Sequence, residues 1–159
     1  MFVTLEGIDR AGKTTQAGLL AKALGPETLL LREPGGTEVG ERIRSLLKDP
    51  GVELDARAEL LLFCAARAEL CAKVIRPALD SGRDVVSDRF IDSTAAYQGA
   101  GRGIGIGEVS RLNDLAIAGC APDLTVLLRV GAGDPEERGR QRLRAGGRDG
   151  TDGFEAEGG

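Results

Sequence analysis

Two patterns of apolar and polar residues alternate along most of the chain. Short apolar runs predict four strands, at residues 2–5, 28–32, 84–87 and 124–130. The stretches between them predict helices, at residues 15–24, 38–48, 55–80, 93–98 and 108–118. Pro77 is expected to kink or end the third of these helices. Uninterrupted apolar strands are typical of parallel sheets covered on both faces, so the pattern predicts an α/β fold of three layers with ligands at the carboxyl ends of the strands.

The remaining segments are rich in glycine or charge. Residues 99–107 are glycine-rich and predict a flexible or tightly packed loop, because no strand precedes them as a second phosphate-binding loop would require. Residues 135–144 predict a basic helical stretch. Residues 145–159 hold mostly glycine and charge, and we expect them to be mobile when alone.

The composition narrows the class of protein. A chain of 159 residues fits one domain, and its net charge of −4 argues against general binding to nucleic acid. Three cysteines without a C-x-x-C spacing predict a reduced, cytoplasmic protein, and no apolar run is long enough to predict a membrane span. Histidine is absent, which removes the commonest general base.

One motif among these predicted elements indicates a binding function. The segment after the first predicted strand fits the phosphate-binding pattern G-x-x-x-x-G-K-[ST], and it reads Gly7, Ile8, Asp9, Arg10, Ala11, Gly12, Lys13, Thr14. Glycines let backbone N–H groups approach phosphate oxygens, Lys13 can reach the β- and γ-phosphates, and the Thr14 hydroxyl can ligate Mg²⁺. A glycine-rich turn without a ligand is the alternative, but the flanking strand and helix favour nucleotide binding.

Four segments, in order, closely resemble bacterial thymidylate kinases. They are GIDRAGKTT at 7–15, REPGGT at 32–37, FCAAR at 63–67 and DRFIDSTAAYQG at 88–99. The resemblance implies a P-loop α/β/α fold with a parallel sheet in the order 2-3-1-4-5. It also implies transfer of the γ-phosphate of ATP to dTMP, Mg²⁺ bound with ATP, a homodimer, and contacts to ATP throughout the loop from Gly7 to Thr15.

The resemblance further assigns a dTMP site, made of Arg44, Phe63, Arg67, Arg89, Thr94, Tyr97 and Gln98. Phe63 and Arg67 are four residues apart and so share a helix face. In the family, the first stacks on thymine and the second donates to thymine O4. Without the resemblance, Phe63 would be interpreted as a core residue and Arg67 as a solvated charge.

The remaining residues of the dTMP site are placed by the family resemblance and not by their spacing in the sequence. Tyr97 matches the residue whose ring lies beneath the deoxyribose and leaves no room for a 2′-hydroxyl. Arg44 matches a position near dTMP, and Thr94 and Gln98 match positions that line the base and sugar.

The implied catalytic residues are Lys13, Arg10, Asp9 and Arg89, and the implied metal ligands are Thr14 and Asp88. Asp9 matches the carboxylate that faces the 3′-hydroxyl and the metal shell, and Arg89 matches a phosphate-clamping arginine. From spacing alone, Asp88 and Arg89 could instead form a surface ion pair. The phosphate nucleophile of dTMP needs no general base, because its second pKa is about 6.

The chain departs from the family in its C-terminal part. Gly153 stands where one branch of the family has a lid arginine, whereas Arg10 matches the branch with a P-loop arginine; Arg144 or Arg148 could also serve the lid. We divide the chain into a nucleoside monophosphate kinase core, 1–131, and a partial lid with a tail, 132–159. Family members continue through a fifth strand, which is absent here. We therefore expect the strand at 124–130 to be an open, apolar edge, and the chain to be less stable than a full-length relative, to self-associate through that strand and to have poor adenine selectivity.

Two other functions stay open at this stage. The chain could phosphorylate another nucleoside monophosphate, although Phe63, Arg67 and Tyr97 argue against this. It could also be a truncated remnant that binds nucleotides without turnover.

Overall fold

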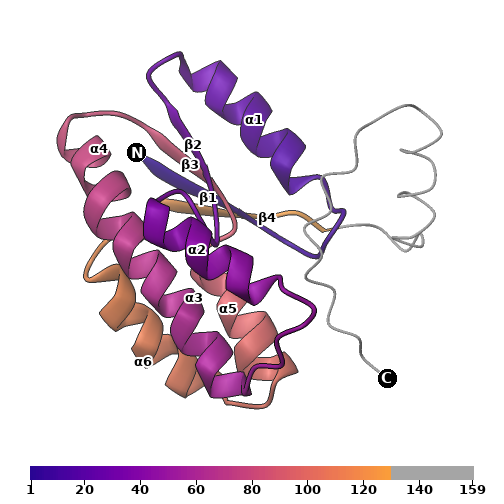
Figure 1. The fold of residues 1–159 in the computed structure, drawn as a ribbon. Helices are drawn as coiled ribbons and strands as arrows, with labels where there is room; N and C mark the ends of the chain where they lie inside the picture. The colour runs from indigo at the N-terminus through magenta and orange to yellow at the C-terminus, as the bar shows by residue number, and fades with distance from the viewer. Residues whose placement is uncertain (130–159) are drawn as a thin grey trace.

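The computed structural model describes residues 1–129 and shows a parallel sheet with helices on both faces (Figure 1). The strands are β1 (Phe2–Glu6), β2 (Leu29–Arg32), β3 (Val85–Asp88) and β4 (Leu124–Leu127). Their order in the sheet is β2-β3-β1-β4, and all three pairings are parallel. The predicted α/β class and the order of the first four strands are confirmed. No fifth strand lies within residues 1–129.

The central strand β1 separates two apolar cores, because successive side chains point to opposite faces of a sheet. On one face Val3 and Leu5 pack with Ala17 of α1 (Lys13–Leu24). On the other face Phe2 packs with Leu70, at the end of α3 (Ala56–Leu70). Figure 1 shows α1 on the first face, whereas α3, α4 (Arg76–Asp80) and α6 (Ile106–Ile117) cover the second.

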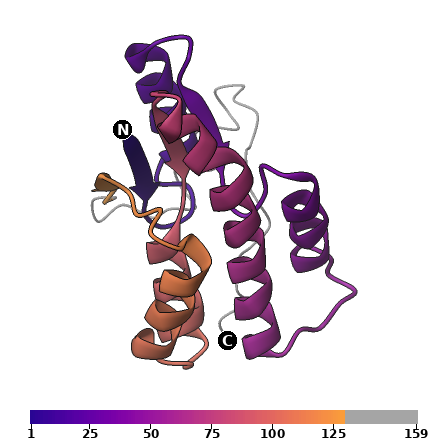
Figure 2. The same cartoon turned by 90° about the vertical axis from the view of Figure 1, so that its left-hand side faces the viewer.

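The long helix predicted at 55–80 is present but irregular. It begins as α3, widens into the π-helical turn η1 (Cys71–Ile75), and continues as α4 (Figure 2). Pro77 lies in the first turn of α4 and has no N–H, and its ring conflicts with the carbonyl four residues earlier. A wider turn just before Pro77 accommodates both effects, so the chain stays helical to Asp80.

The glycine-rich segment forms less loop than the sequence predicts. After the short helix α5 (Ile91–Thr94), the π-helix η2 (Ala95–Gly101) continues past the predicted end at residue 98, and α6 begins at Ile106. Gly99 is buried against α6, where a Cβ would lie 3.5 Å from the Cα of Ile106. This is an ordinary van der Waals distance, so Gly99 lies in a packed helical turn rather than in a flexible loop, and an alanine would also fit there.

An apolar run by itself indicates a covered strand, but without a fifth strand β4 was expected to be an open edge, and it lies at the edge of the sheet that residues 1–129 form. Leu124 is 52% exposed and Leu127 is 63% exposed as a result. The helix α2 (Glu38–Leu47), by contrast, packs against α3. Within the described range, no helix combines the length and apolar character needed to cross a membrane. Val130, the stretch 135–144, the tail and the domain boundary at 131 lie outside the described residues.

Candidate active site

The phosphate-binding motif forms the turn between β1 and α1. Gly7 has φ 142°, and a Cβ there would lie 2.5 Å from the carbonyl oxygen of Leu128. Gly12, with φ 93°, precedes the first turn of α1, so the positive N-terminal end of this helix adjoins the loop. The Lys13 side chain is only 6% exposed, and its Nζ donates to the carbonyl oxygen of Ile8 at 2.7 Å.

Burial and several neighbouring charges shift the pKa of Lys13 in opposite directions. Burial lowers the pKa of Lys13, and the neighbouring Arg89 lowers it further. Asp88 and Asp9 oppose this effect, and the Asp9 carboxylate lies 3.9 Å from Nζ. A phosphate in the loop would add a further anion beside Nζ and would favour the charged ammonium.

Thr14 and Asp88 bring two oxygen ligands together at the carboxyl end of β3. The Thr14 hydroxyl donates to Oδ2 of Asp88 at 2.5 Å, and Oδ1 of Asp88 is buried and has no hydrogen-bond partner among residues 1–129. Mg²⁺ commonly binds one or two protein oxygens and completes its shell with water and substrate phosphates. Thr14 and Asp88 fit that pattern, because they place one hydroxyl and one carboxylate oxygen beside each other next to the phosphate-binding loop.

Arg89 connects the phosphate-binding loop to the rest of the site. It follows β3 with φ 73°, and its Nη2 forms an ion pair with Asp9, not with Asp88. Nη1 donates to the Ser93 hydroxyl at 3.0 Å, and the guanidinium carbon lies 5.3 Å from the centre of the Tyr97 ring. Burial by itself lowers the pKa of Arg89, but Asp9 and Tyr97 raise it above its ordinary value. Arg89 is therefore a fixed positive charge between loop and pocket.

A pocket beside the loop collects side chains from five segments of the chain. It is lined by Asp9, Glu33, Pro34, Arg44, Lys48, Phe63, Arg67, Arg89, Phe90, Ser93, Thr94, Tyr97 and Gln98. All the residues that the sequence assigned to the acceptor site are in this set, together with Asp9. The side chain of Arg44 is 5% exposed, and its Nη1 donates to the carbonyl oxygen of Pro34 at 2.7 Å.

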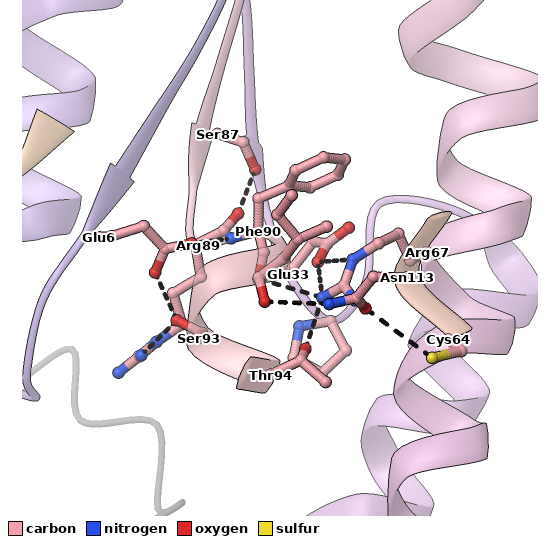
Figure 3. A network of polar contacts seen from close by, with 12 residues as sticks. Glu6, Glu33, Cys64, Arg67, Ser87, Arg89, Phe90, Ser93, Thr94 and Asn113 are labelled. Carbon is pink, nitrogen blue, oxygen red and sulfur yellow. Dashed lines mark hydrogen bonds and ion pairs between the residues drawn. The ribbon is translucent and has the colours of Figure 1, made fainter. Parts of the chain in front are cut away.

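Arg67 is the most constrained side chain of the pocket (Figure 3). It is 2% exposed, so it is not the solvated charge that its spacing alone suggested. Nε and Nη2 donate to Oε2 of Glu33 at 2.9 and 2.6 Å, and Nη1 donates to Oδ1 of Asn113 at 2.6 Å. Nη2 also reaches the Thr94 hydroxyl at 2.9 Å and the Phe90 carbonyl at 3.1 Å. A guanidinium has five N–H groups, and within residues 1–129 the second Nη1 hydrogen finds no acceptor, so it is available to a ligand.

Glu33 was missed as a site residue, although its motif follows a predicted strand. Burial raises the pKa of Glu33, and the charge of Arg67 lowers it. Oε2 is bound to Arg67, whereas Oε1 is buried and has no partner among residues 1–129. Its place after the carboxyl end of β2 was the available signal. Asn113, on α6, gave none.

The other predicted residues lie on or beyond the loop. Ile8 is 51% exposed. Arg10 has φ 63° and is not among the residues that line the pocket. Ala11 precedes α1, and Thr15 lies in its first turn. Arg144, Arg148 and Gly153 lie outside the described residues, so the lid prediction stays a prediction.

Comparisons with known proteins agree on one family. A family model described as thymidylate kinase matches residues 5–157. Thymidylate kinase from Halothermothrix orenii is 48% identical over 147 residues, covering 91% of this chain and 69% of that protein. The same enzyme from Syntrophotalea carbinolica is 48% identical over 148 residues, covering 91% and 67%. The crystal structure of thymidylate kinase from Ehrlichia chaffeensis matches with a TM-score of 0.78 and 44% identity, over 91% of this chain and 79% of that one.

Proposed function

This chain belongs to the thymidylate kinase family, and we propose that it transfers the γ-phosphate of ATP to dTMP, giving dTDP and ADP. One observation carries the proposal. Asp9 belongs to the phosphate-binding loop and also lines the pocket, where it forms an ion pair with Arg89, a second lining residue. A donor phosphate in the loop and an acceptor phosphate at the mouth of the pocket would then meet beside Arg89.

The pocket supports dTMP as the acceptor. Phe63 lies one helical turn from Arg67 on α3 and offers a ring for thymine to stack on. The available Nη1 hydrogen of Arg67 suits thymine O4, and it would disfavour the amino group of cytosine. Tyr97 would exclude a 2′-hydroxyl, and Thr94 and Gln98 would line the base and sugar. Arg44 would lie near the acceptor phosphate.

Catalysis would rest on position and charge rather than on a base. The attacking group is a phosphate oxygen of dTMP, already largely ionised at neutral pH because its second pKa is about 6. Two anionic phosphates repel each other, so the main task is to hold them in line and neutralise them. Lys13, Arg89 and Arg10 would supply the positive charge, and Asp9 would orient Arg89 and the sugar.

Mg²⁺ would enter with ATP. Thr14 and Asp88 would hold it, and Oδ1 of Asp88, which has no hydrogen-bond partner among residues 1–129, could then serve as a metal ligand. When bound, the ion neutralises charge on the β- and γ-phosphates.

A homodimer is part of the same proposal, on the family resemblance. Leu61 of α3 is 55% exposed and Leu115 of α6 is 76% exposed, which is compatible with a contact between copies through these helices. Sedimentation velocity would find a dimer, and Leu115→Lys would shift it towards monomer. A wild-type chain that stays monomeric at micromolar concentration contradicts this part. The cytoplasmic location stays a prediction.

The deciding experiment is coupled ADP release with dTMP, dUMP and AMP as acceptors. We expect kcat/KM to be highest with dTMP. A preference for AMP would assign the chain to another nucleoside monophosphate kinase. ATP binding without ADP release from any acceptor would identify a nucleotide-binding remnant and reject the proposal.

A further inference from the structure

A second buried carboxylate, Glu59, lies on α3 one helical turn before Phe63 and has no role assigned so far. Glu59 is 3% exposed, and its Oε1 accepts a hydrogen bond from Nε2 of Gln98 at 2.6 Å. Its Oε2 accepts from Nη2 of Arg102 at 2.9 Å, and the Arg102 side chain is 48% exposed. Glu59 itself does not line the pocket, but Gln98 does.

This contact fixes the orientation of an amide. A side-chain amide carries donors on its nitrogen and an acceptor on its oxygen, and an ionised carboxylate only accepts. The nitrogen of Gln98 must therefore face Glu59, because the reverse orientation would place two acceptor oxygens against each other. Gln98 is 2% exposed, so no solvent is available to satisfy the reversed amide.

With its nitrogen on Glu59, the amide has its carbonyl oxygen as the one acceptor that it can offer to the pocket. A thymine base attached to its sugar has a single N–H donor, at N3, and two carbonyl acceptors. An acceptor that faces the base therefore matches N3–H. Cytosine has an unprotonated N3, which would face this oxygen with a lone pair.

We propose that Glu59 is a positioning residue: it holds the Gln98 amide so that the carbonyl oxygen of Gln98 accepts a hydrogen bond from the N3–H of a 4-oxopyrimidine nucleotide. Arg67 then supplies a donor and Gln98 an acceptor to the same edge of the base. The inference rests on the proposed function, since it concerns recognition of the dTMP base.

Steady-state kinetics of Glu59→Gln tests the inference. A glutamine at 59 can accept or donate, so Gln98 is free to turn. One hydrogen bond contributes about 1 kcal/mol, and about 1.4 kcal/mol is tenfold in affinity. We expect KM for dTMP to rise about five- to tenfold and the preference for dTMP over dCMP to fall similarly, while KM for ATP changes less than about twofold. Glu69→Gln makes the same substitution on the same helix, outside the pocket, and should leave all three values unchanged.

A double-mutant cycle separates positioning from a purely structural role. In a Gln98→Ala background the amide is gone, so adding Glu59→Gln should change KM for dTMP by less than about twofold. Equal effects of Glu59→Gln in both backgrounds, or no effect in the wild-type background, would overturn the inference. Wild-type turnover of dTMP is measured first, so failure of the proposed function is distinguished from failure of this one.

A paired variant keeps the test open if Glu59→Gln does not fold. In the double substitution Glu59→Gln with Gln98→Glu, the new amide donates to the new carboxylate, whose second oxygen is again an acceptor for the pocket. We expect this variant to bind dTMP within about threefold of wild type. A folded paired variant that binds dTMP as weakly as Gln98→Ala would also overturn the inference.

Discussion

Arg10 and Arg89 both adopt the left-handed backbone conformation, with φ 63° and φ 73°. For residues other than glycine this conformation costs about 1 kcal/mol or more, and such positions gather at functional sites. One of the two lies inside the phosphate-binding loop and the other is paired with Asp9 of that loop. The backbone thus accepts unfavourable angles at the two arginines that the proposed reaction uses.

Arg10→Gly separates the charge of Arg10 from its backbone cost. Glycine adopts φ 63° freely, which offsets the larger entropy it loses on folding, so the free energy of unfolding should change by less than about 1 kcal/mol. The loss of a transition-state charge contact should lower kcat by about 100-fold or more. Kinetics and urea unfolding on the same samples check both parts. A kcat within about threefold of wild type would show that another arginine supplies the charge.

Tyr97 is expected to set the choice between deoxyribose and ribose. Tyr97→Ala should open space at the 2′ position and let the ribonucleotide compete, lowering the deoxy preference in kcat/KM by about tenfold or more. Tyr97→Phe is the matched control, because it keeps the ring and its contact with the Arg89 guanidinium at 5.3 Å. If Tyr97→Ala leaves the ratio of the two acceptors unchanged, the proposed role of the ring is wrong.

At the scale of elements, the phosphate-binding loop is held against the end of the sheet. Leu128 donates its N–H to the carbonyl oxygen of Glu6 at 2.7 Å, and its own carbonyl lies close to Gly7. The loop therefore depends on the segment after β4 as well as on β1 and α1.

A pair of glycine substitutions tests this dependence. Gly7→Ala would place a Cβ 2.5 Å from the Leu128 carbonyl oxygen at φ 142°, so we expect it to destabilise the fold by about 2 kcal/mol or more. Gly18→Ala lies in α1 with open space around it and should stabilise by about 0.5–1 kcal/mol. Denaturant unfolding of both variants measures the two effects. Equal stability of the two would contradict the close approach at Gly7.

At the scale of the whole molecule, three free cysteines are buried in two separate cores. Cys71 and Cys120 share one core cluster, and Cys64 belongs to another. Burial raises the pKa of all three thiols above the ordinary value of 9.0. The folded state therefore keeps thiol protons that the unfolded state loses.

The sign of the resulting pH dependence follows from linkage. A group whose pKa is raised by folding contributes stability below its unfolded pKa and loses it as pH rises through its folded pKa. The free energy of unfolding should thus fall as pH rises above about 9. Other groups also titrate there, so the comparison is with Cys71→Ala, whose fall should be shallower. Parallel curves for the two proteins would contradict the buried-thiol origin.

The order of elements and the chemistry of the loop follow from the sequence alone. Apolar runs and helical spacing are local properties, so the strand before Gly7 and the helix after Gly12 could be predicted. The motif then predicts phosphate binding, because all of its groups are adjacent in the chain. Its glycines let backbone N–H groups approach the phosphate, and Lys13 adds an ammonium group. Phe63 and Arg67 could be placed on one helix face by their spacing, although only the resemblance gave them a substrate.

Only the tertiary structure decided which distant residues meet. The pairing of Arg67 with Glu33 joins α3 to the end of β2, and the contact of Glu59 with Gln98 joins α3 to η2. Neither pairing follows from local spacing, because a buried glutamate and a solvated one look alike in the sequence. For β4, the apolar run alone indicates burial and the missing fifth strand indicates an edge; the folded chain shows how far Leu124 and Leu127 are exposed there. Burial and pairing depend on segments far apart in the chain, and so they appear only once the chain is folded.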